Sequence, residues 1–309
     1  MIQIQNLVKR YGNLVALDHL ELEIHKGEIF GLLGPNGCGK TTAISCLLAL
    51  LKYDKGQITV FGEKMQPDSY DLKKRIGIVP QDVAVFQELS VRENIDYFCG
   101  LYIKDKALRK KCVAEAIKFV GLEDYQKMRP KQLSGGLLRR LNIACGIAHK
   151  PELIIMDEPT VAVDPQSRNH ILEGIQQLNK EGATIIYTSH YMEEVEQICT
   201  RIAILDHGRN VATGTKEELK QMIKIGERIT IEGIVLTKEQ LEAIGALSHV
   251  YQTIYENQKL VVCCSLAKQN LIRVLHYLEQ EEITFGKIFS ELPTLNDVFL
   301  EITGKELRD

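Results

Sequence analysis

A glycine-rich segment between an apolar strand and a helix constrains the fold of this chain more than any other feature. The segment is GPNGCGKT, Gly34 to Thr41, and it fits the pattern G-x-x-x-x-G-K-[ST]. The apolar run Ile29–Leu33 predicts a buried strand before it, and a helix is predicted from Lys40 to about Leu51. In this context a glycine loop turns backbone N–H groups inward at the positive end of a helix. Chance alone gives the pattern in roughly 1% of chains this long, so we expect a site for the triphosphate of Mg-ATP.

The side chains of the glycine-rich segment are expected to have different roles in nucleotide binding. Lys40 can reach the β- and γ-phosphates, and the Thr41 hydroxyl can ligate Mg²⁺. A thiol beside N–H groups at a helix N-terminus can have a lowered pKa, as at Cys38, although we prefer the interpretation of an inert replacement of serine. The residues expected to contact the nucleotide here are Gly34, Pro35, Asn36, Gly37, Cys38, Gly39, Lys40, Thr41 and Thr42.

A second apolar strand, LIIMDE from Leu153 to Glu158, ends in two acids. In a parallel sheet such a strand would deliver Asp157 to the carboxyl edge, where a carboxylate can hold Mg²⁺ through a water. Glu158 would then be the general base that polarises the attacking water. A solvated strand end gives the same pattern, so the assignment depends on the glycine loop.

A second anion-binding pattern occurs in LSGGLLRR, Leu133 to Arg140. Ser134 is a good N-cap, Gly135 and Gly136 expose backbone N–H groups, and a helix follows. Taken alone, the segment is equally consistent with a plain helix cap. One nucleotide has little use for two distant anion sites, unless the second serves a nucleotide bound to another molecule.

The order of these motifs resembles the nucleotide-binding domain of an ABC ATPase. LSGG lies a short helix before LIIMDEP, and the glycine loop lies well upstream of both. The resemblance covers residues 1–219 and implies an α/β P-loop NTPase core with a parallel sheet, N-terminal antiparallel β strands and a helical subdomain. It also implies that two copies of the chain bind ATP between them, head to tail.

The resemblance implies roles for four more residues. Tyr11 would stack on adenine, and Gln81, in IGIVPQD, would sense the γ-phosphate and Mg²⁺. Asp164, in VAVDP, would lie in the loop that joins the two subunits and borders the nucleotide, and His190 would contact the γ-phosphate. Without the family, Tyr11 reads as an exposed turn aromatic and His190 as a structural histidine. The implied ligands of Mg²⁺ are Thr41, Gln81 and Asp157.

Two positions depart from the family pattern. Leu137 stands where glutamine is usual, and Val161-Ala162-Val163 replaces the usual Ser-Gly-Leu. The first departure should leave ATP contact intact, because Ser134, Gly135 and Gly136 face the phosphate. The second concerns signalling across the dimer, in a direction that the sequence does not give.

A second domain is expected at residues 220–309. Its predicted elements follow the order β-α-β-β-α-β, which is the split βαβ arrangement of a small α+β domain, with an accessory or dimerisation role. The predicted elements are a strand at 228–234, a helix at 238–247, strands at 249–255 and 259–264 around a turn at 256–258, a helix at 268–278 and a strand at 283–289.

Composition excludes several classes of protein. The net charge of −3 gives no indication of a nucleic-acid partner. The N-terminus lacks the apolar region of a signal peptide, and no run approaches the roughly 18 apolar residues of a membrane span. The eight cysteines form no CxxC pair, which favours buried, reduced thiols in the cytosol. The resemblance to ABC ATPases of transporters implies in addition a peripheral position at the cytoplasmic face of a membrane.

Within this family, transport is the favoured function. The ending SELPTLNDVFLEITGKELRD resembles that of ATPase subunits of bacterial drug-resistance exporters, such as those for daunorubicin or linearmycin. The expected partners are a second copy of the chain and a membrane permease docked near Gln81 and Val83–Asn94. An importer with a regulatory C-terminal domain stays open as the alternative. A soluble ABC ATPase of DNA repair or translation is disfavoured, because there is one nucleotide-binding domain and no coiled-coil insertion.

Overall fold

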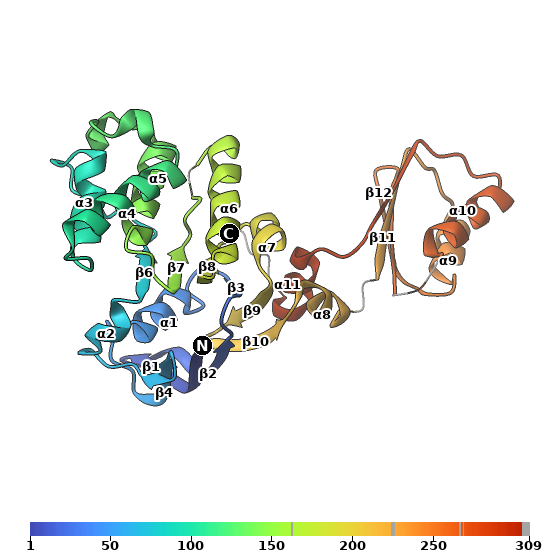
Figure 1. The fold of residues 1–309 in the computed structure, drawn as a ribbon. Coiled ribbons are helices and arrows are strands. Elements are labelled where there is room, and N and C mark those ends of the chain that lie inside the picture. The colour runs from blue at the N-terminus through green and yellow to red at the C-terminus, as the bar shows by residue number, and fades with distance from the viewer. Residues whose placement is uncertain (162, 224–225, 266, 268, 305–309) are drawn as a thin grey trace. The chain divides into compact units, whose positions relative to one another are not determined.

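The computed structural model describes residues 1–161, 163–223, 226–265, 267 and 269–304, in two compact units that divide after Thr215 (Figure 1). The division precedes residue 220 because helix α8 (Lys216–Gln221) packs against α11 (Leu295–Thr303) of the second unit. Ala162, Lys268 and residues 305–309, which entered the sequence analysis, lie outside the described residues. No helix in the described part of the chain is long and apolar enough to cross a membrane.

The first unit is built on a six-stranded sheet in the order β10-β9-β3-β8-β7-β6. All neighbours are parallel except β10, which pairs antiparallel with β9. Every residue of β3 and β8 is buried, as expected where helices cover both faces of a parallel sheet. The strands are β3 (Ile29–Leu33), β6 (Ile76–Val79), β7 (Leu153–Asp157), β8 (Thr184–Thr188), β9 (Arg201–Asp206) and β10 (Arg209–Gly214).

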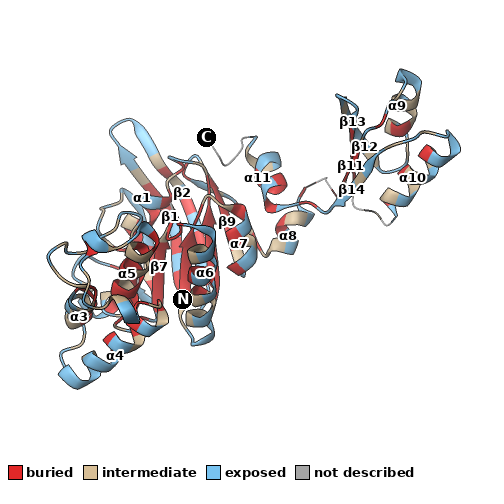
Figure 2. Cartoon of the chain, turned by 90° about the horizontal axis from the view of Figure 1, so that it is seen from above, coloured by how far each residue is buried: buried red, intermediate tan, exposed pale blue. Residues whose placement is uncertain are grey.

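An antiparallel sheet, in the order β2-β1-β4-β5, lies beside helix α1 (Lys40–Leu47). The two sheets and α1 share one hydrophobic core, seen in Figure 2 as buried residues along their facing sides. The helix ends before the predicted Leu51, because Ala49 takes a left-handed conformation, φ 52°, and Leu50 is exposed. The strands are β1 (Ile2–Tyr11), β2 (Leu14–Ile24), β4 (Lys55–Val60) and β5 (Glu63–Lys64).

Helices that follow the strands complete the first unit. The region predicted to be helical from 90 to 122 consists of two helices that pack with α5. Ser90 and Asp105 cap them through side-chain hydrogen bonds. The helices are α2 (Tyr70–Lys73), α3 (Val91–Gly100), α4 (Lys106–Phe119), α5 (Gly135–Ile147), α6 (Pro165–Lys180) and α7 (Met192–Ile198).

The second unit contains an antiparallel sheet in the order β12-β13-β11-β14, with α9 and α10 packed on one face around a core of its own. Asn257 and Gln258 both have positive φ, which is what a two-residue hairpin turn requires. The elements are β11 (Glu227–Glu232), α9 (Lys238–Gly245), β12 (Val250–Glu256), β13 (Lys259–Cys264), α10 (Asn270–Gln280) and β14 (Lys287–Glu291). The predicted fold class, an α/β core with antiparallel N-terminal strands, a helical subdomain and a split βαβ tail, is confirmed.

Candidate nucleotide-hydrolysis site

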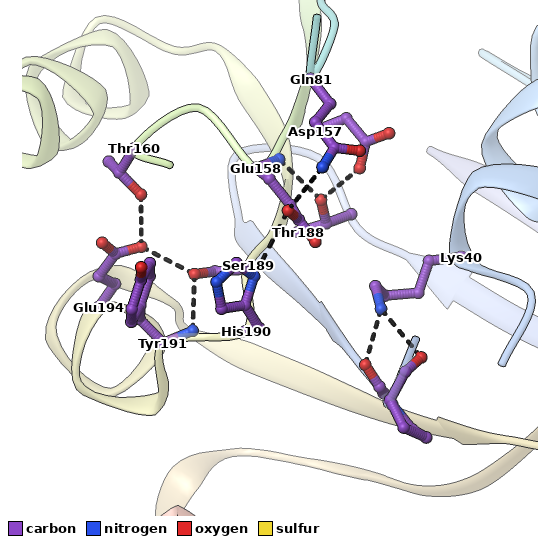
Figure 3. A network of polar contacts seen from close by, with 12 residues as sticks. Lys40, Gln81, Asp157, Glu158, Thr160, Thr188, Ser189, His190, Tyr191 and Glu194 are labelled. Carbon is purple, nitrogen blue, oxygen red and sulfur yellow. Dashed lines mark hydrogen bonds and ion pairs between the residues drawn. The ribbon is translucent and has the colours of Figure 1, made fainter. Parts of the chain in front are cut away.

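The glycine loop connects the buried strand β3 to the first turn of α1. Gly39 has φ 109°, and a Cβ there would lie 2.7 Å from the carbonyl oxygen of Ala16, so only glycine fits. The Nζ of Lys40 donates hydrogen bonds to the carbonyl oxygens of Gly34 at 2.7 Å and Pro35 at 3.2 Å (Figure 3). The loop therefore holds a buried ammonium group at the N-terminus of a helix, an arrangement that attracts phosphate.

Cys38 is buried inside the same loop. Burial raises the pKa of its thiol, and the charge of Lys40 only partly opposes this shift. The hypothesis of a lowered pKa is therefore wrong, because the helix N-terminus and Lys40 do not offset the loss of hydration. The Sγ lies close to the backbone of Gly34, where it packs as a small apolar group.

Thr188, which the sequence analysis did not single out, orients both acids at the end of β7. It pairs in register with Asp157 across the parallel strands β7 and β8. Its Oγ1 donates a hydrogen bond to Asp157 Oδ1 at 2.6 Å and accepts one from the backbone N–H of Glu158 at 3.0 Å. A threonine at the end of the apolar run ATIIYT, directly before Ser189, was the available signal.

Three predicted residues meet at one oxygen of Glu158 (Figure 3). Glu158 Oε2 accepts a hydrogen bond from Gln81 Nε2 at 3.1 Å and lies 3.4 Å from His190 Nδ1. Gln81 follows β6 and His190 follows β8, the two strands that flank β7 in the sheet. Glu158 is buried and has φ 47°, an unfavourable conformation for a residue with a side chain, of the kind found at functional sites.

The loop that carries Gln81 is held by the helix that begins at the LSGG motif. Arg139 Nη1 donates to the carbonyl oxygens of Gln81 at 2.6 Å and Pro80 at 3.3 Å. Asn142 Nδ2 donates to Pro80 at 3.1 Å, and its Oδ1 accepts the N–H of Ala84 at 3.0 Å. Both side chains are buried. Buried polar residues on an otherwise apolar helix face were the missed signal.

The LSGG residues lie apart from the glycine loop within one chain: α5 sits with α3 and α4, and α1 lies beside β1 and β2 in both views (Figures 1 and 2). Ser134 caps α5 by accepting the N–H of Leu137 at 3.4 Å, and Ser134 and Gly135 are exposed. Gly136 is buried; a Cβ there would lie 3.2 Å from Asp164 Oδ2.

Asp164 and Tyr11 occupy the ends of their elements. Asp164 caps α6, and its Oδ1 accepts the N–H of Ser167 at 2.9 Å. Hydrogen bonds from the backbone and side chain of Ser167 lower the pKa of the Asp164 carboxyl group. Tyr11 ends β1 with half of its surface exposed, and Lys9 Nζ lies 5.1 Å from its ring centre. The ring is therefore accessible to a planar ligand.

The residues fit a nucleotide with one bound Mg²⁺. No group of three or more His, Cys, Asp or Glu side chains suited to a metal occurs among the described residues. Mg²⁺ at nucleotide sites takes only one or two protein oxygens and completes its shell with phosphate and water. The exposed Thr41 and the partly buried Asp157 can supply these oxygens.

Comparison with known proteins gives matches over the whole chain. Residues 17–161 match the family model for ABC transporter. The chain is 41% identical to the linearmycin resistance ATP-binding protein LnrL of Bacillus subtilis, with 100% of both chains covered. It is 33% identical to the Nod factor export ATP-binding protein I of Cupriavidus pinatubonensis, covering 100% of this chain and 92% of the relative. It is also 33% identical to the daunorubicin resistance ATP-binding protein DrrA3 of Streptomyces coeruleorubidus, covering 99% and 97%.

Solved structures agree with the fold. A dimeric ATP-binding cassette in a post-hydrolysis state, bound to ADP and Pi, superposes with a TM-score of 0.64 at 27% identity, covering 70% of this chain and 98% of that one. With the glycine loop, the paired acids and the LSGG helix in place, and with a relative this similar over its full length, the chain belongs to the ABC transporter family, as an ATP-binding protein that hydrolyses ATP to drive transport.

Proposed function

We propose that this chain is the ATP-hydrolysing subunit of a bacterial-type exporter, bound peripherally at the cytoplasmic face of a membrane and working through a separate permease. The support is the full-length similarity to relatives named for export or for antibiotic resistance. This similarity includes the C-terminal unit, on which the alternative of an importer depended. Drug or antibiotic efflux is the activity that these names favour.

The observation that carries the hydrolytic mechanism is the convergence of Gln81 and His190 on Glu158 Oε2. Glu158 takes the proton of the attacking water, and Gln81 fixes the orientation of the carboxylate. His190 and Lys40 face the γ-phosphate from two sides. Thr41 and Gln81 would hold Mg²⁺ directly and Asp157 through a water, and the ion would supply positive charge to the phosphate oxygens when present.

Two copies are proposed to close head to tail over two nucleotides. Ser134 and Gly135 are exposed at the N-terminus of α5, and α5 lies apart from α1 and the glycine loop of the same chain, so their ligand is the nucleotide bound to the other copy. The dimeric state of the related cassette supports this arrangement. ATP then joins the subunits, and hydrolysis releases them.

The permease is proposed to dock beside Gln81, on the segment Val83–Asn94 and its neighbours. Asn94 holds this segment: its Oδ1 accepts the N–H of Phe86 at 2.8 Å and its Nδ2 donates to the Phe86 carbonyl oxygen at 3.0 Å. Phe86 packs edge-on against Tyr97 at 4.8 Å between ring centres, and both are more than two-fifths exposed. An exposed aromatic pair, formed by this hydrogen-bonded loop and helix α3, suits a protein partner.

Residues 220–309 are proposed to form an accessory domain that supports dimerisation. On the sheet face away from α9 and α10, Ile254, Val261, Thr230 and Phe289 stand in one row across the four strands. Ile254 and Phe289 are each 45% exposed. A strip of this kind is suited to contact another subunit.

Glu158→Gln tests the proposed mechanism. The amide keeps the size of the side chain but cannot take a proton, so we expect ATP hydrolysis to fall by about 10²–10⁴-fold while ATP binding stays unchanged and an ATP-dependent dimer accumulates. Turnover by the purified full-length chain, nucleotide binding by calorimetry and dimer formation by gel filtration measure the three effects. Glu173→Gln, the same change at an exposed position on α6, is the matched control. Normal turnover of the Glu158 variant would assign the base elsewhere.

The direction of transport needs a separate experiment. We expect the chain to co-purify with a membrane protein from its native host, and the pair to pump substrate into inside-out vesicles when ATP is added. Accumulation only in right-side-out vesicles would establish import instead.

A further inference from the structure

A second buried carboxylate, Glu194, lies one helical turn beyond His190 on α7 and is not used by the mechanism above. It is 2% exposed. Its Oε2 accepts hydrogen bonds from Thr160 Oγ1 at 2.8 Å and Ser189 Oγ at 2.8 Å (Figure 3). It accepts a third from Tyr187 Oη at 2.7 Å. Three hydroxyl donors on one oxygen, one from the loop after β7 and two from the end of β8, make this side chain the centre of a network.

The charge of Glu194 is balanced at its other oxygen. Arg168 Nε of helix α6 lies 3.3 Å from Glu194 Oε1. A buried carboxylate is tolerated only when paired and hydrogen-bonded, and this one is both. Burial and the nearby carboxylate hold the pKa of Tyr187 well above its usual value, so the tyrosine stays protonated and remains a donor.

The network reaches His190 by two routes. The Ser189 hydroxyl donates a hydrogen bond to Glu194, and its Oγ accepts one from the backbone N–H of Tyr191 at 3.0 Å. The residues on both sides of His190 are therefore hydrogen-bonded to each other. The ring of Tyr191 also packs on the ring of His190, 4.4 Å between centres, and Arg168 lies over that same tyrosine at 4.6 Å.

The network also reaches the base and the subunit-joining loop. Thr160 lies two residues after Glu158, and Arg168 lies one helical turn after the cap residue Asp164. The loops after β7 and β8 therefore meet at the carboxylate of Glu194. A shift of the loop near Asp164 must move Thr160 or Arg168 relative to Ser189.

We propose that Glu194 is a positioning residue for ATP hydrolysis, which fixes His190 relative to Glu158 and connects both to the loop at Asp164. This inference rests on the proposed roles of His190 and Glu158. Glu194 itself contacts neither nucleotide nor water in this role. Its effect is to hold the backbone on both sides of His190, where a displacement of about 1 Å can cost a hundredfold in rate.

Glu194→Gln in the full-length chain tests the proposal. The glutamine amide has no negative charge to pair with Arg168. It also replaces one carboxylate oxygen, which only accepts hydrogen bonds, with an NH₂ group, which donates them, and the three hydroxyls need an acceptor. We expect kcat to fall by about tenfold or more, with KM and Kd for ATP within about twofold of wild type because the glycine loop is untouched. Glu193→Gln is the matched control, since this neighbouring residue is exposed and we expect wild-type rates.

Ser189→Ala keeps the test decisive if the glutamine variant folds poorly. It removes a single hydroxyl, and we expect a smaller loss of kcat with the same unchanged KM. Because both substitutions break the same hydrogen bond, the double variant should be no slower than Glu194→Gln alone. Rates are normalised to the number of ATP-binding sites, so that unfolded protein does not count.

Two outcomes would overturn the proposal: a kcat of Glu194→Gln within twofold of wild type, or losses from the two substitutions that multiply. Failure of the proposed hydrolytic mechanism would give a different result: Glu158→Gln and His190→Ala would themselves keep normal ATP hydrolysis. If those variants lose hydrolysis as expected and Glu194→Gln does not, only the positioning role is removed.

Discussion

His149, just after α5, is a base that its environment keeps neutral. Its ring stacks on Tyr102 with 4.0 Å between centres, and Nε2 lies 3.2 Å from the carbonyl oxygen of Ile76. Burial lowers its pKa to about 4, and the hydrogen bond to Ile76 opposes this only in part. The neutral ring joins the helical subdomain to the central sheet, and protonation in acid weakens this contact.

The stability of the first unit should therefore depend on pH through His149. The unfolded chain binds a proton near pH 6.5 and the folded chain only near 4, so stability falls as the pH drops below 6.5. Between pH 8 and pH 5 the loss from this residue is about 2 kcal/mol. His149→Phe, which keeps the stacking on Tyr102, should flatten the fall in Tm measured by calorimetry over this range. His25→Phe, at an exposed position, should not, and identical slopes for wild type and His149→Phe would contradict the assignment.

At the scale of elements, helix α5 connects the LSGG motif to the loop of Gln81. The motif is at its first turn, and Arg139 and Asn142, one and two turns later, hydrogen-bond the loop. Burial lowers the pKa of Arg139, but the guanidinium keeps its charge because it is a very strong base. A movement of α5 therefore moves the loop that carries the Glu158 partner and borders the proposed permease dock.

Removing this connection should impair hydrolysis without weakening ATP binding. Arg139→Met keeps most of the side-chain length but leaves the Gln81 carbonyl oxygen without its donor, at a cost of about 1–3 kcal/mol in stability. We expect a kcat reduced severalfold and faster hydrogen exchange at residues 81–86. Arg140→Met is the control, because Arg140 donates to Ser167 of α6 rather than to this loop. Unchanged exchange at residues 81–86 in Arg139→Met would show that α5 does not hold the loop.

At the scale of the whole molecule, the two halves of the ATP site are presented by different regions of the first unit. The glycine loop opens beside α1, and the LSGG residues open at α5 (Figure 1). Because the LSGG cap is exposed, closure over ATP is expected to require a second copy. The proposed function can therefore be tested by measuring whether the chain forms a dimer with ATP.

Ser134→Arg should block the dimer while leaving nucleotide binding intact. In the Glu158→Gln background, which is expected to trap the dimer, the added arginine side chain would occupy the space needed by the other copy's nucleotide. Light scattering with ATP should then report a monomer. Ser134→Ala loses only a cap, about 1 kcal/mol, and should still dimerise. A dimer of unchanged stability in Ser134→Arg would place the interface elsewhere.

Much of this fold was predictable from local pattern. The strand before Gly34, the helix after it, the cap at Ser134 and the hairpin at Asn257 each depend on neighbours within a few residues, so the sequence contains their cause. Glu158 was assigned from the two acids that end a predicted strand, and Gln81 and His190 from resemblance to a family. That the three side chains meet at one oxygen was not predicted. The end of α1 was misplaced because Ala49 takes a left-handed conformation that the apolar pattern does not show.

The sequence by itself determined the phosphate-binding loop, the strand and helix on either side of it and the identity of the acids at the end of β7, and it predicted a second domain at residues 220–309. Only the tertiary structure decided which polar groups meet. Glu194 accepts hydrogen bonds from the hydroxyls of Thr160, Tyr187 and Ser189, and burial raises the pKa of the Cys38 thiol. The physical reason is range: helix and turn signals act over a few residues, whereas hydrogen-bond partners and desolvation are set by sheet register and packing between distant segments.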